Sequence, residues 1–359
     1  MKSEKIPSTL RAIGIVIGIV LMWSTTAGAQ VPEDIASELR ALGTGVCVPE
    51  TAVLYRPLHQ SAPYPGITVV RDIPYIDDER TLMDVFAPEE GDDNRPVLIF
   101  VSGGGGDNRV TGPDGDAFYD NIMLWAVENG MTGVNMQRRG GFGGGLAWDA
   151  AARDLGVLVD WVRENIADYK GDPDRIFIWA SSAGNGPVST YAAHPEISGA
   201  NEESIKGVIL MSAPNFNILP VTVSQGTQPS TPYPEGIGTN CGRPQVEAGG
   251  GRGRGFGRGG RGGGRGGAAE PPDGATLLAR SNLAGLANGK TAVFVGWGEI
   301  DSPNVIVFDE ALEDALCEAG RCPTVGIFDD HSHMSLVFAP NTDDDSVTGP
   351  ILEWMRSVD

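Results

Sequence analysis

Long apolar runs, histidine and cysteine are all scarce in this sequence of 359 residues, and each scarcity excludes a class of protein or site. An apolar run lies near the N-terminus, from Ile13 to Trp23. Its roughly eleven residues are well short of the roughly twenty that a membrane-spanning helix needs. The four histidines and four cysteines lack the CxxC and histidine spacings of a zinc site. The sequence therefore predicts neither a membrane-spanning protein nor a metal centre.

Residues 1–29 have the pattern of a secretory signal peptide. Lys2 and Lys5 precede the apolar run, and Ala27–Ala29 supplies the small residues of a cleavage site. Cleavage there leaves a mature chain that begins at Gln30. We expect this chain in the periplasm or outside the cell, with no membrane partner. A retained membrane anchor is the alternative, and the shortness of the apolar run counts against it.

Positive charge is also in short supply. The chain has 26 Lys and Arg against 47 Asp and Glu, a formal net charge of −21. Such acidity repels nucleic acid. One stretch of the acidic chain is basic. Residues 249–267 are rich in glycine and arginine, and arginine-glycine repeats can bind RNA. Export and the surplus of acids favour a disordered, solvated linker instead, with no nucleic-acid partner.

The cysteines form an even set, which in an oxidising compartment favours disulfides. Cys317 and Cys322 flank a short turn and are the expected pair, which leaves Cys47 and Cys241 as the other possible pair. Two disulfides, or one disulfide with two buried thiols, are both consistent with the sequence.

From about residue 67, short β-branched runs alternate with helical stretches. This alternation is typical of an α/β fold with a mostly parallel sheet covered by helices on both faces. The expected strands are Ile67–Tyr75, Leu82–Ala87, Val97–Ser102, Met131–Met136, Arg175–Ala180, Gly207–Ser212, Thr291–Trp297 and Pro323–Phe328. The expected helices are Ala117–Asn129, Ala147–Ala167, Ala183–Ala193, Asn304–Ala319 and Ser346–Val358.

The chain thus divides into a signal peptide (1–29), an N-terminal extension (30–66) and one α/β domain (67–359). Residues 215–273 interrupt this domain with a segment rich in proline, glycine and serine that has no convincing periodicity. We interpret the segment as an irregular, cap-like insertion.

A serine stands where a strand is expected to turn directly into a helix. The strand Arg175–Ala180 leads into the sequence Ser-Ser-Ala-Gly, and small neighbours such as Ala180 and Gly184 permit a turn that lifts a hydroxyl above the sheet. Ser182 is the predicted nucleophile, and Ser181 is the adjacent alternative. A helix N-cap is the structural alternative for Ser182.

The sequence around this serine, residues 161–186, resembles the carboxylesterase and hormone-sensitive-lipase-like branches of the α/β-hydrolase superfamily. In that superfamily DP-x-R-I precedes the nucleophile strand and S-A-G follows it. Ala180 departs from the usual Gly-x-Ser-x-Gly, because it replaces the first glycine. The resemblance covers roughly residues 67–358. It implies an α/β-hydrolase fold, a serine hydrolase acting on carboxylic esters, and no cofactor.

The resemblance also implies an oxyanion hole. Where the family has His-Gly-Gly-Gly, this chain has Ser102 followed by four glycines. The N–H groups of Gly104 and Gly105, with that of Ala183, would stabilise the negative charge on the attacked carbonyl oxygen. Ser102 replaces the family's histidine, so the hydrogen bonds that normally hold this loop in place are not expected to be the same here. A phosphate-binding loop is disfavoured because G-x-x-x-x-G-K-[ST] is absent.

In this fold the acid and the base follow the serine in that order. The sequence GEID after the strand 291–297 matches the family's G-x-x-D turn and predicts Asp301 as the acid, with Glu299 as the alternative. The family's H-x-H turn matches the sequence HSH and predicts His333 as the base, with His331 as the alternative. A zinc site made of both histidines does not match a known catalytic spacing.

The predicted function is that of an exported serine hydrolase that cleaves short-chain or aromatic esters through an acyl-enzyme. The insertion 215–273 is expected to supply the acyl pocket, and a small-molecule ester is the expected partner. One alternative is a peptidase or acyl-aminoacyl hydrolase with the same catalytic residues. Another is a non-catalytic binding protein on a hydrolase scaffold, which Ala180 and Ser102 suggest. The oligomeric state stays open.

Overall fold

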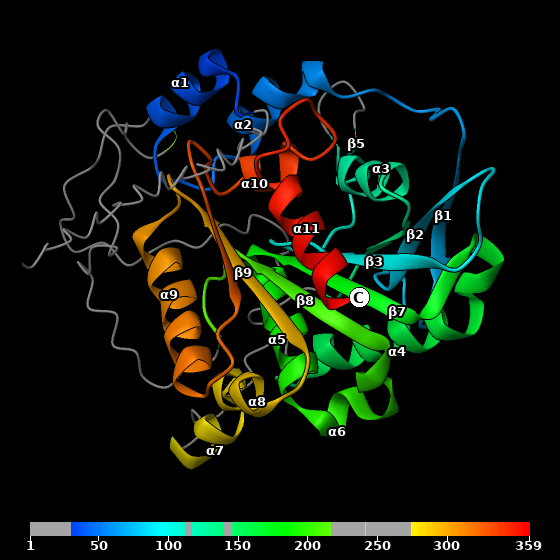
Figure 1. Cartoon of the computed structure of the whole chain (residues 1–359), viewed down its shortest axis with the longest axis vertical. Coiled ribbons are helices and arrows are strands. Elements are labelled where there is room, and N and C mark those ends of the chain that lie inside the picture. The colour runs from blue at the N-terminus through cyan, green and yellow to red at the C-terminus, as the bar shows by residue number, and fades with distance from the viewer. Residues whose placement is uncertain (1–29, 112–116, 140–145, 217–240, 242–273) are drawn as a thin grey trace, which may run out of the picture.

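The structure, a computed structural model, describes residues 30–111, 117–139, 146–216, 241 and 274–359 (Figure 1). The predicted signal peptide, the glycine- and arginine-rich stretch and nearly all of the insertion 215–273 lie outside these residues.

An eight-stranded sheet forms the centre of the fold, with the strand order β1-β2-β6-β3-β7-β8-β9-β10. Strand β2 pairs antiparallel with β1 and with β6, and the remaining neighbours are parallel. The strands are β1 (Ile67–Pro74), β2 (Leu82–Pro88), β3 (Arg95–Val101), β6 (Thr132–Met136), β7 (Gly171–Ser181), β8 (Ile205–Met211), β9 (Ala292–Gly298) and β10 (Thr324–Phe328). All eight expected strands are present with shifted ends, and the predicted α/β class is confirmed.

The central strands are apolar throughout because both faces of the sheet are covered. Along β3, successive side chains point to opposite faces. Leu98 and Phe100 join one hydrophobic cluster, and Val97, Ile99 and Val101 join the other. All five are fully buried. A continuous apolar run of this kind therefore indicates a strand between two helical layers.

Helices lie on both faces of the sheet (Figure 1). Buried residues of α1 (Glu33–Leu42), α2 (Val48–Tyr55), α3 (Asp120–Glu128), α10 (Ser335–Phe338) and α11 (Thr348–Val358) belong to the first cluster. Those of α4 (Ala150–Asn165), α5 (Asn185–Ala193), α8 (Asn282–Asn288) and α9 (Pro303–Glu318) belong to the second. The short helices α6 (Pro195–Ser198) and α7 (Gly274–Ala279) complete the described set.

One predicted helix begins later than expected. The helical pattern from Ala117 becomes α3 only at Asp120, because β5 (Ala117–Phe118) pairs with β4 (Val110–Thr111) in a small two-stranded sheet. Pairing with a distant segment overrides local helical propensity here.

The N-terminal extension is helical and packs on the C-terminal part of the domain. Arg40 of α1 forms an ion pair with Asp330, and His59 Nε2 donates to the carbonyl oxygen of Phe338 at 2.7 Å. Tyr55 of α2 is fully buried. Helices this short are marginal alone, so packing rather than propensity stabilises them. These helices were not predicted from the sequence, although Ile35, Ala36 and Leu39 recur at helical spacing and form the buried face of α1.

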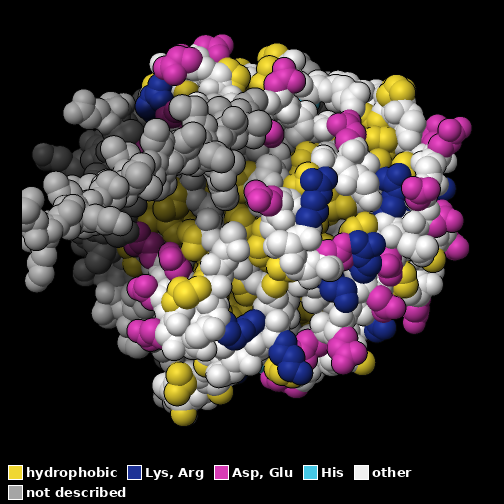
Figure 2. Space-filling model, in the orientation of Figure 1, with side chains coloured by type: hydrophobic (Ala, Val, Ile, Leu, Met, Phe, Trp, Pro, Cys, Tyr) yellow, Lys and Arg dark blue, Asp and Glu magenta, His cyan; other side chains and the backbone are white. Residues whose placement is uncertain are grey.

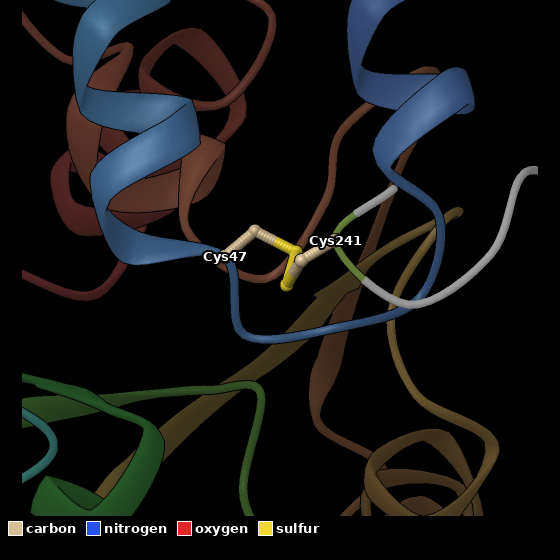
Figure 3. Close-up of a disulfide and its surroundings, with 2 residues drawn as sticks. All are labelled: Cys47 and Cys241. Atoms are coloured by element: carbon tan, nitrogen blue, oxygen red, sulfur yellow. A yellow bond between two sulfur atoms is a disulfide. The ribbon is translucent and has the colours of Figure 1, made fainter. Parts of the chain in front are cut away.

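Two disulfides are present, and they match the expected pairing. Cys317 bonds to Cys322 between α9 and β10. Cys47, which begins α2, bonds to Cys241 across 194 residues of sequence (Figure 3). Disulfides persist in oxidising compartments and are rare in the cytosol of most organisms.

The visible surface carries charges of both signs. Acidic and basic side chains are interspersed over the described part of the face in Figure 2, without a continuous basic patch. Among the described helices, none is both long and apolar enough to cross a membrane.

Candidate active site

Ser182 lies at a sharp turn between β7 and α5. Its φ is +51°, in the left-handed region that non-glycine residues rarely adopt. Such a conformation costs about 1–3 kcal/mol and persists only where the surrounding structure holds it. Neither the 3-10 helix η3 (Ser182–Gly184) nor α5 has a side-chain cap hydrogen bond, so Ser182 is not acting as an N-cap. The buried Ser181, its sequence alternative, ends the strand β7.

Two neighbours hold this turn. A Cβ on Gly184 would lie 2.2 Å from the carbonyl oxygen of Val101, so only glycine fits. The buried Asn185 amide donates to the carbonyl oxygens of Ser182, at 2.8 Å, and Met211, at 2.7 Å. Asn185 was not singled out from the sequence. A polar residue directly after S-A-G, on a stretch that must be buried, is the signal that could have found it.

The glycine-rich loop after β3 lies directly against Ser182. A Cβ on Gly103 would come within 2.7 Å of Ser182 Cβ and 3.3 Å of its Oγ. Gly104 has a φ of +53°. The N–H groups of Gly104 and Gly105 donate no hydrogen bond to any described residue. Ser102, which replaces the family's histidine, donates to the carbonyl oxygen of Asp107 at 2.6 Å and so braces the loop. Gly103 is a close-approach residue that the sequence did not single out.

Asp301 and His333 are in direct contact, although they follow different strands, β9 and β10. The distance from His333 Nδ1 to Asp301 Oδ1 is 2.9 Å, and both side chains are buried. Asp301 also accepts hydrogen bonds from the Ser212 hydroxyl and, at 2.8 Å, from the backbone N–H of Ser302. Ser212, at the end of β8, was not expected from the sequence.

The other ring nitrogen of His333, Nε2, is buried and has no hydrogen-bond partner among the described residues. Burial lowers the pKa of His333, but the charge and hydrogen bond of Asp301 outweigh burial, so the pKa lies above its ordinary value. The imidazole is thus oriented by Asp301, and Nε2 is available to exchange a proton.

A second carboxyl lies near Asp301. Asp309 of α9 is fully buried and accepts from the backbone N–H of Ala213 at 3.2 Å. Burial raises the pKa of Asp309 well above its ordinary value, and the negative charge of Asp301 adds to this effect. The raised pKa favours the neutral form of Asp309, which avoids a second buried negative charge beside Asp301.

The alternative residues hold the turn that carries His333. His331 Nδ1 lies 2.9 Å from Ser335 Oγ, and its Nε2 lies 3.3 Å from Asp344 Oδ2. Burial raises the pKa of Asp344, but its hydrogen bond to His331 reverses this, and the net pKa is below the ordinary value. Glu299 accepts from the backbone N–H of Asp330 at 3.0 Å. Neither His331 nor Glu299 is joined to the Asp301–His333 pair by these hydrogen bonds.

Within the described ranges, no group of three or more His, Cys, Asp or Glu side chains is arranged to hold a metal ion.

Part of the chain is similar to known protein sequences. Residues 78–231 match the profile of the Carboxylesterase family. The para-nitrobenzyl esterase of Bacillus subtilis is 29% identical over 143 residues, which are 37% of this chain and 28% of that protein. The liver carboxylesterase of Sus scrofa is 34% identical over 106 residues, which are 28% of this chain and 18% of that protein. The chain thus matches less than a third of the length of either relative.

Solved structures resemble almost the whole chain at low sequence identity. A thermophilic carboxylesterase cloned from a metagenomic library covers 91% of this chain over 97% of its own, with a TM-score of 0.56 and 17% identity. A hyperthermophilic esterase from the archaeon Pyrobaculum calidifontis covers 92% over 98% of its own, with a TM-score of 0.55 and 14% identity. The chain therefore has the α/β-hydrolase fold, and its residues 78–231 match the profile of the carboxylesterase family.

Proposed function

We propose that this protein is an exported serine hydrolase that cleaves carboxylic esters, with Ser182 as nucleophile, His333 as base and Asp301 as acid. The observation that carries the proposal is the buried contact between His333 and Asp301, which leaves His333 Nε2 without a partner among the described residues. A structural histidine would be expected to satisfy both ring nitrogens, because an unpaired buried polar atom costs about 1–3 kcal/mol.

The chemistry follows from this arrangement. Ser182 Oγ attacks the ester carbonyl while His333 Nε2 takes the hydroxyl proton. The N–H groups of Gly104, Gly105 and Ala183 stabilise the oxyanion. His333 then protonates the leaving alcohol, and the same residues deacylate the enzyme with water. Asp301 holds the imidazole with Nδ1 protonated and stabilises the imidazolium that forms.

Export and substrate class rest on separate features. Residues 1–29 have the signal-peptide pattern, and two disulfides suit an oxidising compartment. The names of the relatives, para-nitrobenzyl esterase and liver carboxylesterase, favour carboxylic esters, among them aromatic ones.

The test is turnover of a p-nitrophenyl ester series combined with covalent labelling. The purified protein should hydrolyse short-chain esters, and a fluorophosphonate should add one label, located by mass spectrometry on Ser182. Ser181→Ala is the matched control, and it should be labelled as the parent is. A protein that neither turns over esters nor takes the label would instead be a binding protein on a hydrolase scaffold.

The rate should depend on pH in a direction set by the raised pKa of His333. This imidazole must be neutral to accept the serine proton, so activity is absent at low pH and appears as the pH rises through its pKa. We expect the acid limb of kcat/KM to have its midpoint above about 6.5, the ordinary value for histidine. A midpoint below that value would contradict the influence of Asp301.

A further inference from the structure

A buried arginine lies behind the glycine-rich loop. Arg138 follows β6 and is 2% exposed. Its Nη2 donates to the carbonyl oxygen of Ser102 at 3.1 Å and lies 3.5 Å from that of Gly104. Among the described residues Arg138 forms no ion pair, whereas its neighbour Arg139 pairs with Asp154. A buried guanidinium without a carboxylate is costly, so this one depends on the dipoles of the loop.

The loop is shaped around this side chain. A Cβ on Gly106, whose φ is +87°, would lie 2.5 Å from Arg138 Cγ. The backbone N–H of Arg138 donates to the Gly106 carbonyl oxygen at 2.9 Å. Burial lowers the pKa of Arg138, yet a guanidinium does not lose its proton in proteins, so the positive charge stays.

The consequence for the loop follows from peptide geometry. In a planar trans peptide the C=O and the N–H point in opposite directions. The carbonyls of Ser102 and Gly104 point to Arg138, so the N–H groups of Gly103 and Gly105 point away from it. The Gly103 carbonyl accepts from the Gly106 N–H at 3.1 Å, which turns the Gly104 N–H outward as well.

We propose that Arg138 is a positioning residue of the oxyanion hole. By holding the Gly104 carbonyl, it fixes the direction of the Gly105 N–H. By holding the Ser102 carbonyl, it anchors the start of the loop, in which the hydrogen bond from Gly106 to Gly103 directs the Gly104 N–H. Its positive charge also polarises the same peptide units, which strengthens the bonds these groups donate. Both effects favour the oxyanion more than the neutral ester, and they lower the barrier to acylation. This inference rests on the proposed function.

The test compares Arg138→Met with Arg139→Met, which removes an adjacent guanidinium whose hydrogen bonds go to Asp154 rather than to the loop. Deleting one direct oxyanion donor lowers kcat about 10²–10³-fold. Because Arg138 acts through the loop, we expect its loss to lower kcat by about 10- to 100-fold with little change in KM. Arg138→Lys keeps the positive charge but lacks the planar guanidinium with its several N–H donors. Its kcat should fall between those of the parent and Arg138→Met. The kcat of Arg139→Met should stay near that of the parent.

A second substrate separates positioning from a general structural defect. A thionoester develops its charge on sulfur, which accepts hydrogen bonds weakly, so its hydrolysis gains little from the oxyanion hole. Arg138→Met should therefore lose ester turnover much more than thionoester turnover. An unchanged kcat, or equal losses for both substrates, would overturn the inference.

Gly106→Ala tests the same contact from the loop side, since its Cβ would displace Arg138. If circular dichroism shows that Arg138→Met does not fold, Gly106→Ala takes its place in the test. We expect Gly106→Ala to lose ester turnover much more than thionoester turnover. The two proposals fail differently. The esterase proposal would be refuted if Ser182→Ala hydrolysed esters as fast as the parent. The inference about Arg138 alone would be refuted if Ser182→Ala were inactive while Arg138→Met hydrolysed esters as fast as the parent.

Discussion

Replacing Ser182 by alanine is expected to reduce kcat for ester hydrolysis by about 10⁶-fold, as loss of the nucleophile does in a serine hydrolase. Alanine tolerates the same backbone as serine, so the turn with φ of +51° should form and the melting temperature should change little. Steady-state kinetics on p-nitrophenyl acetate, with protein checked by thermal melting, measures both.

The kcat of His333→Ala should fall by a similar factor. The double variant of Ser182→Ala and His333→Ala should be no slower than either single variant. Residues that act as a unit are strongly non-additive, because removing one already disables the other. Losses that multiply in the double variant would indicate that Ser182 and His333 act independently, and would refute the assignment.

Asp301→Asn should lower kcat by about 10⁴-fold while leaving the fold intact. The amide occupies the same space, but it can present an N–H to His333 Nδ1, and the imidazole would then carry its proton on Nε2. In that tautomer Nε2 cannot take the serine proton. The carboxylate also stabilises the imidazolium across the 2.9 Å contact, and the amide does not.

Glu299→Gln is the matched control for this acid. Glu299 lies on the same turn, but its carboxylate accepts from the backbone of Asp330 rather than from His333. Its kcat should stay within a few fold of that of the parent. If Glu299→Gln lost as much activity as Asp301→Asn, the acid would be misassigned.

The strands and the candidate residues could be predicted because each has a local signature. The run RIFIWA indicates a strand covered on both faces, and the small residues that follow it indicate a sharp turn. His333 and Asp301 were found because the order of motifs along the chain is fixed by the fold. Their contact at 2.9 Å brings together two residues that were located independently.

The residues that support the site could not be predicted, because their roles arise from tertiary contacts. Ser212 and Asn185 are ordinary polar residues in the sequence. The pairing of β8 with β9 brings Ser212 to Asp301, and the packing of β8 against the turn at Ser182 brings Asn185 to Met211. Helix α1 was missed although its sequence has a local signature, with Ile35, Ala36 and Leu39 on one buried face and Gly43 at the C-cap. Its ion pair from Arg40 to Asp330, far along the chain, could not be predicted.

The disulfide between Cys47 and Cys241 makes the chain a covalent ring followed by a tail. The ring contains the glycine-rich loop and Ser182, and the tail contains Asp301 and His333. The proposed nucleophile therefore lies in the ring, and the proposed base lies in the tail. A peptide bond cut between residues 217 and 240 would open the ring but leave all parts joined through sulfur. A cut between residues 242 and 273 would leave the tail held by packing alone, so that reversible dissociation could separate the base from its serine.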